Sequence, residues 1–318
     1  MKRIALPRPP RGRPTLTVVI PCYNYGHFLP AAVQSILSQD DVDARVLIVD
    51  DASPDGSGDV AEALSERDRR VRVIRHARNA GHIRTYNDGL RTVDTEFVSL
   101  VSADDIVAPG SLGRAVALMQ RHPAVGLVYG SIATFAEDSE PLPRKQRPYH
   151  LWRIWGGDEW IARVAAEGWN PIASPEAVIR TSAMSQVGFY NPALPHSGDL
   201  EYWLRIASRW DVGQIHGPIQ AYYRVHDSNM HTSTFGSREA DLRERLAAFR
   251  VLEDPRIAAA LPTAPQRLDE ALATVDAQLA ELIDDRRRMQ AEDSSSLREL
   301  RHALVSARDG DHAKGRAS

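Results

Sequence analysis

Short, uninterrupted apolar runs alternate with helix-like stretches along the first 130 residues of the chain. The apolar runs, which are rich in β-branched residues, are Leu16–Ile20, Arg45–Val49, Val71–Ile74, Phe97–Val101 and Val125–Tyr129. Stretches with helical spacing lie between them at Leu29–Gln39, Asp59–Arg69, Ile83–Val93 and Pro109–Gln120. Runs that are apolar throughout are typical of strands buried on both faces of a sheet. The pattern therefore predicts an α/β fold with a mostly parallel sheet flanked by helices.

Acidic residues follow two of these predicted strands. Asp50 and Asp51 end the second strand, and Asp104 and Asp105 come soon after the fourth. Open α/β sheets bind ligands outside the carboxyl ends of their strands, so these carboxylates are expected at a ligand site. The glycine-rich patterns that hold phosphates, G-x-G-x-x-G and G-x-x-x-x-G-K-[ST], are both missing from the sequence after the first strand. The remaining common way to hold a diphosphate is a divalent cation bound by carboxylates.

The pattern is less regular between residues 131 and 235. This region is rich in Trp, His, Pro and Gly, and we interpret it as long loops that form a binding surface. Helical spacing with many charges returns in Leu242–Leu252 and Arg267–Met289. The second of these stretches carries a single apolar stripe, which must be buried against the rest of the chain or against a second copy in a homodimer.

These shifts divide the chain into four regions. Residues 1–14 are basic and Pro-rich and are expected to be a disordered tail. Residues 15–130 and 131–235 are expected to form two parts of one α/β domain. Residues 236–318 are expected to form a C-terminal helical extension with a disordered end at Asp309–Ser318.

Composition limits the partners and the location. The formal net charge of -3 argues against nucleic acid as the main partner. No apolar run reaches the ~18 residues of a membrane-spanning helix, and only the cluster Arg286–Arg288 suits peripheral contact with a membrane surface. The single cysteine, Cys22, excludes an internal disulfide and suits a cytoplasmic location, including the inner face of the membrane.

Five segments, in order, carry a resemblance to a known family. They read VVIPCYNYGHFLPAAVQSILSQ, LIVDDASPDGS, RNAGHIRTYNDGL, FVSLVSADD and SGDLEYWLRIA. Together they resemble family 2 of the glycosyltransferases, a large inverting family with the GT-A fold, over about residues 15–233. The resemblance implies a nucleoside-diphosphate sugar donor (linked to UDP, GDP or dTDP), a divalent metal (Mn²⁺ or Mg²⁺) and an acceptor that the sequence leaves open.

The resemblance also assigns roles to individual residues. Asp199 matches the catalytic base, Asp105 matches the direct metal ligand, and His226 matches a histidine that completes the metal shell. Residues that match nucleotide-sugar contacts are Pro21, Tyr23, Asn24, Asp51, Asn87 and Asp104. His196 and Trp169 are candidates for the acceptor site, because both lie in the aromatic region near Asp199.

The chain departs from the family pattern at two positions, and simpler roles compete with the functional ones. Gly198 stands where the family often has Glu, and Tyr86 stands where it often has Arg. Asp199 could instead be a helix N-cap, since Asp is a preferred capping residue. Two other classes of protein are weighed: a non-catalytic sugar-nucleotide or glycan-binding module, and a sugar nucleotidyltransferase. The second needs a glycine-rich basic loop, which Pro21–Gly26 does not provide.

Overall fold

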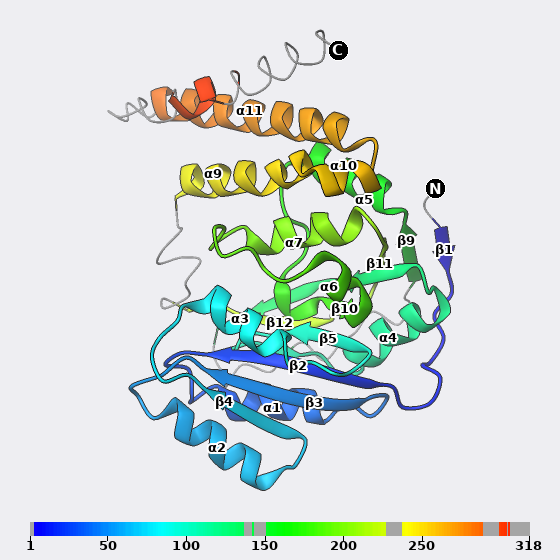
Figure 1. Cartoon of the computed structure of the whole chain (residues 1–318), viewed down its shortest axis with the longest axis vertical. Helices are drawn as coiled ribbons and strands as arrows, with labels where there is room; N and C mark the ends of the chain where they lie inside the picture. Colours follow the sequence, from blue (N-terminus) through cyan, green and yellow to red (C-terminus); the bar gives the residue numbers. More distant parts are fainter. Residues whose placement is uncertain are drawn as a thin grey trace.

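The computed structural model describes residues 3–136, 142, 151–226, 237–288, 299–303 and 305. In this part of the chain a nine-stranded sheet runs through the centre, in the order β1-β9-β11-β7-β10-β5-β2-β3-β4. A second sheet has three strands in the order β6-β12-β8. Figure 1 shows the large sheet crossing the molecule, with α1 and α2 on one side and α7, α9 and α11 in successive layers on the other. The α/β prediction is confirmed.

The strands predicted from apolar runs form one end of the large sheet. Its parallel strands are β2 (Thr15–Cys22), β3 (Asp43–Asp50), β4 (Val71–Arg75) and β5 (Phe97–Leu100). The helices between and after them are α1 (Leu29–Leu37), α2 (Ser57–Arg67), α3 (His82–Leu90) and α4 (Ser111–Arg121). Strands β2, β3 and β5 are almost entirely buried, as expected for apolar runs covered on both faces.

The other strands are mixed in direction. They are β6 (Ile106–Val107), β7 (Val125–Tyr129), β8 (Ile132–Phe135), β9 (Leu151–Trp155), β10 (Val178–Arg180), β11 (Asp211–His216) and β12 (Ala221–Arg224). β10 lies antiparallel between β5 and β7 and joins the two ends of the sheet. Parallel pairing of β12 with β8 brings residues after 220 beside the segment that follows β7.

The interpretation of residues 131–235 as long binding loops is wrong for much of this region. It contains the strands just described, together with α5 (Gly157–Glu167), the short 3₁₀ helix η1 (Ser174–Glu176), α6 (Thr181–Val187) and α7 (Gly198–Ala207). Trp152, Trp160 and Trp203 are fully buried in the core. The elements are short and their core positions are aromatic, so the pattern of apolar residues does not show their periodicity.

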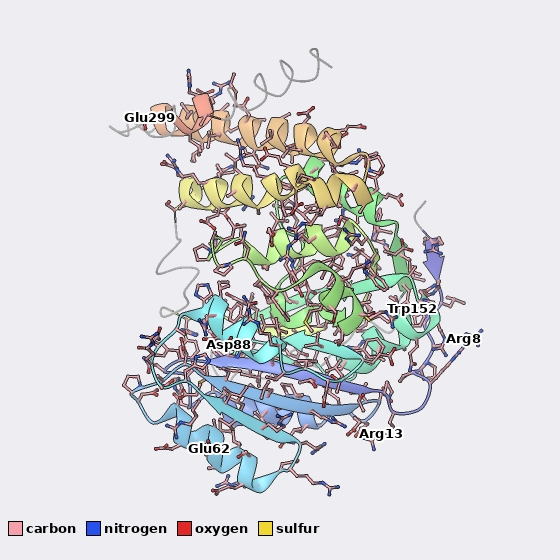
Figure 2. All side chains as sticks on the ribbon, in the orientation of Figure 1. Arg8, Arg13, Glu62, Asp88, Trp152 and Glu299 are labelled. Atoms are coloured by element: carbon pink, nitrogen blue, oxygen red, sulfur yellow. The ribbon has the colours of Figure 1, made fainter. Side chains whose placement is uncertain are left out.

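The N-terminal tail is also not wholly disordered. Residues Arg3–Ala5 form strand β1, which pairs antiparallel with β9 so that Ala5 lies opposite Trp152. Figure 2 labels Trp152 on β9, beside the N-terminal strand. Arg3 forms an ion pair with Asp211. A three-residue strand is too short to give a sequence pattern, and its backbone partner lies about 150 residues away.

The C-terminal helices pack onto the domain. They are α9 (Arg238–Phe249), η2 (Arg250–Glu253), α10 (Pro255–Ala260) and α11 (Ala264–Arg288). The apolar stripe of α11 is buried against α5 and α9, through Leu268, Leu272, Val275 and Leu279. This stripe is covered within the chain and gives no support to a homodimer.

Two expectations at the C-terminus lie outside the described residues: the disorder of Asp309–Ser318 and the contacts of the Arg286–Arg288 side chains. Among the helices that the structure describes, none has the length and apolar character needed to cross a membrane.

Candidate functional site

Two cavities meet at the carboxyl edge of the parallel strands. The first, which we name the Asp51 cavity, has a volume of about 570 Å³ and is lined by Pro21–Tyr25, Asp51, Asn79, Thr85 and Asp104, among others. The second, the Asp199 cavity, has a volume of about 610 Å³ and includes Trp169, Asn170, Glu176, His196 and Asp199. Four residues line both: His82, Tyr86, Ser102 and Tyr223. Both volumes fall in the range of small-molecule sites, and the shared wall makes the two cavities neighbours.

The loop after β2 and the loop after β3 form one side of the Asp51 cavity. Asn24 adopts a left-handed conformation with φ 62°, and its N–H donates to Ser53 Oγ at 3.0 Å. Ala52, directly after Asp51, also has a positive φ, 58°. Such conformations are uncommon outside glycine and cluster at functional sites. The predicted residues Pro21, Tyr23 and Asn24 are thus brought to the same cavity as Asp51.

The Asp51 carboxylate holds the segment that precedes α3. Its Oδ1 lies 2.7 Å from His76 Nδ1 and accepts the N–H of Ala80 at 2.8 Å, and its Oδ2 accepts the N–H of Gly81 at 2.9 Å. Burial raises the pKa of Asp51, but the hydrogen bonds outweigh burial, so the net pKa lies below its ordinary value. Asp51 is therefore ionised and fixed in place at the cavity wall.

Asp104 and Asp105 are adjacent in the sequence but have different surroundings. Asp104 lines the Asp51 cavity, and its Oδ2 lies 3.1 Å from His226 Nε2. Asp105 is 0% exposed, and its Oδ1 accepts the N–H of Arg224 at 3.0 Å. Consecutive residues at a strand end point to different sides, so only one of the pair faces the cavity. Asp105 therefore lies buried behind Asp104, and its role as the direct metal ligand stays a prediction.

Arg224 anchors the acidic pair from behind. Its guanidinium lies between the rings of Phe28 and Phe135, at 4.4 and 4.3 Å from their centroids, and its Nε donates to the Asp104 carbonyl at 2.9 Å. The His226 ring is stacked with Phe28 at 5.6 Å between centroids. The acidic pair and the imidazole are thus held by one aromatic cluster.

A divalent metal fits this group of residues. In the part of the chain that the structure describes, no three His, Cys, Asp or Glu side chains form a complete metal shell, so a bound ligand would have to supply the remaining donors. Asp104 and His226 offer oxygen and nitrogen donors that Mn²⁺ accepts. Asp105 Oδ2 is buried without a hydrogen-bond partner, and burial next to Asp104 raises the pKa of Asp105 well above its usual range. A cation nearby would stabilise both carboxylates.

Asn87, which is predicted to contact the nucleotide sugar, lines neither the Asp51 cavity nor the Asp199 cavity. Its Nδ2 donates to the Tyr190 carbonyl at 2.9 Å, and its Oδ1 accepts the Tyr190 N–H at 2.9 Å. Both halves of the amide are therefore used to tie α3 to the segment before α7. The residue is 3% exposed, and its nucleotide-sugar contact stays a prediction.

Asp199 lies in the first turn of α7, at the wall of the Asp199 cavity. Ser197 occupies the N-cap position, but its side chain makes no capping hydrogen bond. Asp199 Oδ1 accepts the N–H of Leu200 at 2.8 Å, and Oδ2 accepts Nδ2 of Asn170 at 3.0 Å. Burial raises the pKa of Asp199 to about 6, although these hydrogen bonds and His196 oppose the shift.

The two predicted acceptor residues also reach the Asp199 cavity. Trp169 is 46% exposed and lines it, in contrast to the buried tryptophans of the core. His196 Nε2 lies 3.3 Å from Asp241 Oδ1, so α9 of the C-terminal extension contributes to this wall. The cavity is thus assembled from α3, α7, α9 and the segment around residue 170.

Sequence analysis missed four residues at these cavities. Tyr86 and Tyr223 form the shared wall, and burial followed by the nearby carboxylates raises the pKa of Tyr223 to about 12. Asn170 and Glu176 hold the segment opposite α7. Tyr86 could have been found as a departure from the family pattern, whereas the plain loop sequence around Asn170 has no distinguishing feature.

The central sheet with its flanking helices has the GT-A fold. In solved structures, S. aureus TarS 1–349 in complex with UDP-GlcNAc is similar, with a TM-score of 0.60 at 15% identity over 93% of this chain and 92% of that one. A mannosyltransferase from Pyrobaculum calidifontis, in complex with GDP-Man and Mn²⁺, has a TM-score of 0.53 at 17% identity over 94% and 88% of the two chains. The GT-A fold is confirmed.

Sequence comparison gives the family. The model of glycosyl transferase family 2 matches residues 17–182. An uncharacterised glycosyltransferase of a Nostoc species is 35% identical over 242 residues, 69% of this chain and 67% of that protein. Glycosyltransferase GlyG of Streptococcus pneumoniae is 36% identical over 92 residues, which span only 31% of its length. The chain belongs to glycosyltransferase family 2.

Proposed function

We propose that the chain is an inverting glycosyltransferase that moves a sugar from a nucleoside-diphosphate donor to an acceptor hydroxyl. The nucleotide would occupy the Asp51 cavity, and the acceptor would occupy the Asp199 cavity. The observation that carries the proposal is the shared wall of the two cavities, with Asp104 lining one and Asp199 lining the other. A donor sugar at this wall would have its diphosphate on one side, in the Asp51 cavity, and the acceptor on the other side, in the Asp199 cavity.

The Asp51 cavity suits a ligand that brings its own negative charge together with a cation. No Lys or Arg is found among its lining residues in the part of the chain that the structure describes. We assign Asp104 and His226 as the residues that hold Mn²⁺ or Mg²⁺, with Asp105 buried behind them. When bound, the metal offsets the charge that develops on the departing diphosphate. The UDP-GlcNAc and the GDP-Man with Mn²⁺ in the two solved neighbours support a donor of the UDP, GDP or dTDP class.

Asp199 is assigned as the general base. A sugar hydroxyl is a weak nucleophile near neutral pH, so its proton must be accepted as the new bond forms. The raised pKa of about 6 keeps Asp199 ionised at pH 7 and makes it a stronger base than an ordinary carboxylate. Attack from the acceptor side, opposite the diphosphate, gives inversion at the anomeric carbon.

Two smaller assignments complete the proposal. His196 and Trp169 line the acceptor side, where an exposed indole offers an apolar face to a sugar ring. A cytoplasmic location, at the inner face of the membrane if α11 makes peripheral contact, is consistent with the single buried cysteine.

The test combines a donor screen with two matched variants. UDP-, GDP- and dTDP-sugars are incubated with the protein and Mn²⁺, and slow donor hydrolysis or transfer is followed. Asp199→Asn should lower turnover by at least about a hundredfold while donor affinity stays unchanged. Asp241→Asn is the matched control, because it removes a carboxylate of the same cavity that is already paired with His196 and Arg245. This variant should lose much less turnover than Asp199→Asn does. Equal turnover in wild type and Asp199→Asn would reject the base.

The same screen separates the other two classes. Donor consumption that requires pyrophosphate would identify a nucleotidyltransferase. Donor binding with no hydrolysis or transfer under any condition would identify a binding module. In the wild type, kcat/KM should rise with pH through about 6, because the base must lose its proton before it can accept one.

A further inference from the structure

The segment between α5 and η1 presents an amide to the Asp199 carboxylate. Asn170 Nδ2 donates to Asp199 Oδ2 at 3.0 Å. Asn170 Oδ1 accepts the backbone N–H of Ile172 at 3.1 Å. Because the oxygen is occupied by a backbone donor, the NH₂ group is the end that must face Asp199. The Asn170 amide therefore has one defined orientation, with its NH₂ group donating to the Asp199 carboxylate.

A buried carboxyl group holds this segment in place. Glu176 Oε1 accepts the N–H of Ala173 at 3.2 Å, and Oε2 accepts the N–H of Gly130 at 3.0 Å. Gly130 directly follows β7, so the segment is tied to the central sheet. Glu176 is 5% exposed, and both of its oxygens are used. The position of Asn170 is thus set by the sheet and does not depend on a ligand.

Asp199 has donors on both oxygens, one from each side. The N–H of Leu200 donates to Oδ1 from α7 itself, and Asn170 donates to Oδ2 from across the cavity. Each carboxylate oxygen has two lone-pair directions, so each keeps one that is free to accept a proton. Two fixed donors restrict rotation of a carboxylate that lines the cavity.

We infer that Asn170 is a positioning residue, which orients the Asp199 carboxylate and keeps it ionised for the proton transfer. This inference rests on the proposed role of Asp199 as the base. A hydrogen bond donated to the ionised form favours that form over the protonated one. Loss of the Asn170 donor should therefore displace the Asp199 titration to higher pH.

Several other titratable groups face Asp199, and none of them changes in this experiment. His196 lies three residues before it, Tyr86 approaches from α3, and Tyr190 approaches from the segment before α7. The wall of the cavity adds Tyr223 of β12, Glu176 of η1, and the pair Asp241 and Arg245 of α9. The electrostatic effect of these groups on the pKa of Asp199 is therefore the same in the wild type and in the Asn170 variants.

Two variants of Asn170 separate the electrostatic role from a role in folding. Asn170→Asp keeps the shape and the oxygen that accepts the Ile172 N–H, but it places a second carboxylate against Asp199. When two carboxylates share a site, the pKa of one of them is raised strongly. The pH at which kcat/KM reaches half of its maximum on the acid side should therefore be higher than in the wild type by at least about one pH unit. Asn170→Ala removes the donor without adding charge and should shift the limb in the same direction by less.

Asn191→Asp is the matched control. Asn191 Oδ1 accepts the N–H of Ala193 at 3.0 Å, in the same two-residue turn as Asn170 and Ile172, but its side chain has no contact with Asp199. Its variant should leave the pH profile unchanged. A shift in Asn191→Asp equal to that in Asn170→Asp would assign the effect to general charge and overturn the inference.

A direct titration makes the result independent of turnover. Protein labelled with ¹³C at the aspartate carboxyl carbons is titrated by NMR, and the Asp199 resonance is identified by its loss in Asp199→Asn. The Asp199 titration should move to higher pH in Asn170→Ala. An unchanged Asp199 titration in folded Asn170→Ala overturns the inference. Failure of Asp199→Asn to lower turnover overturns the proposed function instead, so the two failures are distinguishable.

Discussion

Glu176 gives a quantitative prediction for stability. Its carboxyl group is buried, no cationic side chain contacts it in the described part of the chain, and burial raises its pKa from 4.5 to about 7. The folded state therefore binds the proton more tightly than the unfolded state does. The contribution of Glu176 to stability is fully present below about pH 4.5 and is lost as pH rises through the window from 4.5 to about 7, because the unfolded state releases the proton first.

The size of the effect follows from the width of that window. Each pH unit is worth about 1.4 kcal/mol for one proton, so the free energy of unfolding should lose about 3 kcal/mol between pH 5 and pH 8 through this residue. Glu176→Gln cannot ionise, but its amide has only one acceptor oxygen, so either the Gly130 or the Ala173 N–H loses its acceptor. That loss is a constant offset at every pH. The free energy of unfolding of the variant relative to the wild type should therefore rise by about 3 kcal/mol from pH 5 to pH 8.

Urea unfolding, followed by far-UV circular dichroism at several pH values, measures this difference. Taking the difference between variant and wild type removes the titration of all other groups. Glu62→Gln is the control, because Glu62 is exposed on α2 (Figure 2) and should give a difference near zero at every pH. The reasoning is refuted if the difference between Glu176→Gln and wild type stays constant from pH 5 to pH 8.

Two further predictions test the roles of Asn87 and Asp104. Asn87→Ala removes the side chain that pairs with the N–H and the carbonyl of Tyr190. The free energy of unfolding should therefore fall by about 2–4 kcal/mol, and nucleoside-diphosphate affinity should stay unchanged. A loss of affinity at unchanged stability would instead support a nucleotide contact. Asp104→Ala should weaken nucleoside-diphosphate binding by at least about tenfold when Mn²⁺ is present and should not change it when EDTA is present. Calorimetry measures the affinity under both conditions. Equal affinities of variant and wild type with Mn²⁺ would contradict the assignment of Asp104 as a metal ligand.

The parallel strands of the central sheet could be predicted because each one is visible as a short apolar run in the sequence. Each of β2, β3 and β5 is an apolar run buried on both faces, so burial leaves a direct pattern in the residues. The acidic pairs after β3 and β5 could also be predicted at a ligand edge, because all parallel strands of such a sheet end on the same side. Asp51 and Asp104 do line one cavity.

The direction of a side chain could not be predicted in the same way. Asp104 and Asp105 are identical in type and adjacent, yet one faces the cavity and the other faces Arg224. Asn87 lies in a segment that resembles a nucleotide-binding motif, but its partner is the backbone of Tyr190, 103 positions away. Partners of this kind depend on how distant segments pack, and that information is not present in a local pattern.

Five segments gave the resemblance to the family, and the sequence by itself predicted the α/β class, the carboxylates at the strand ends and a helix that begins near Asp199. These features are encoded locally, in residue type and in periodicities of a few positions. Only the tertiary structure decided which acid faces the cavity, that the tail adds a strand, that α11 covers its own domain, and that Asn170 meets Asp199. Each of these depends on segments far apart in the chain that meet only when the core closes, because hydrogen bonds and burial act through space.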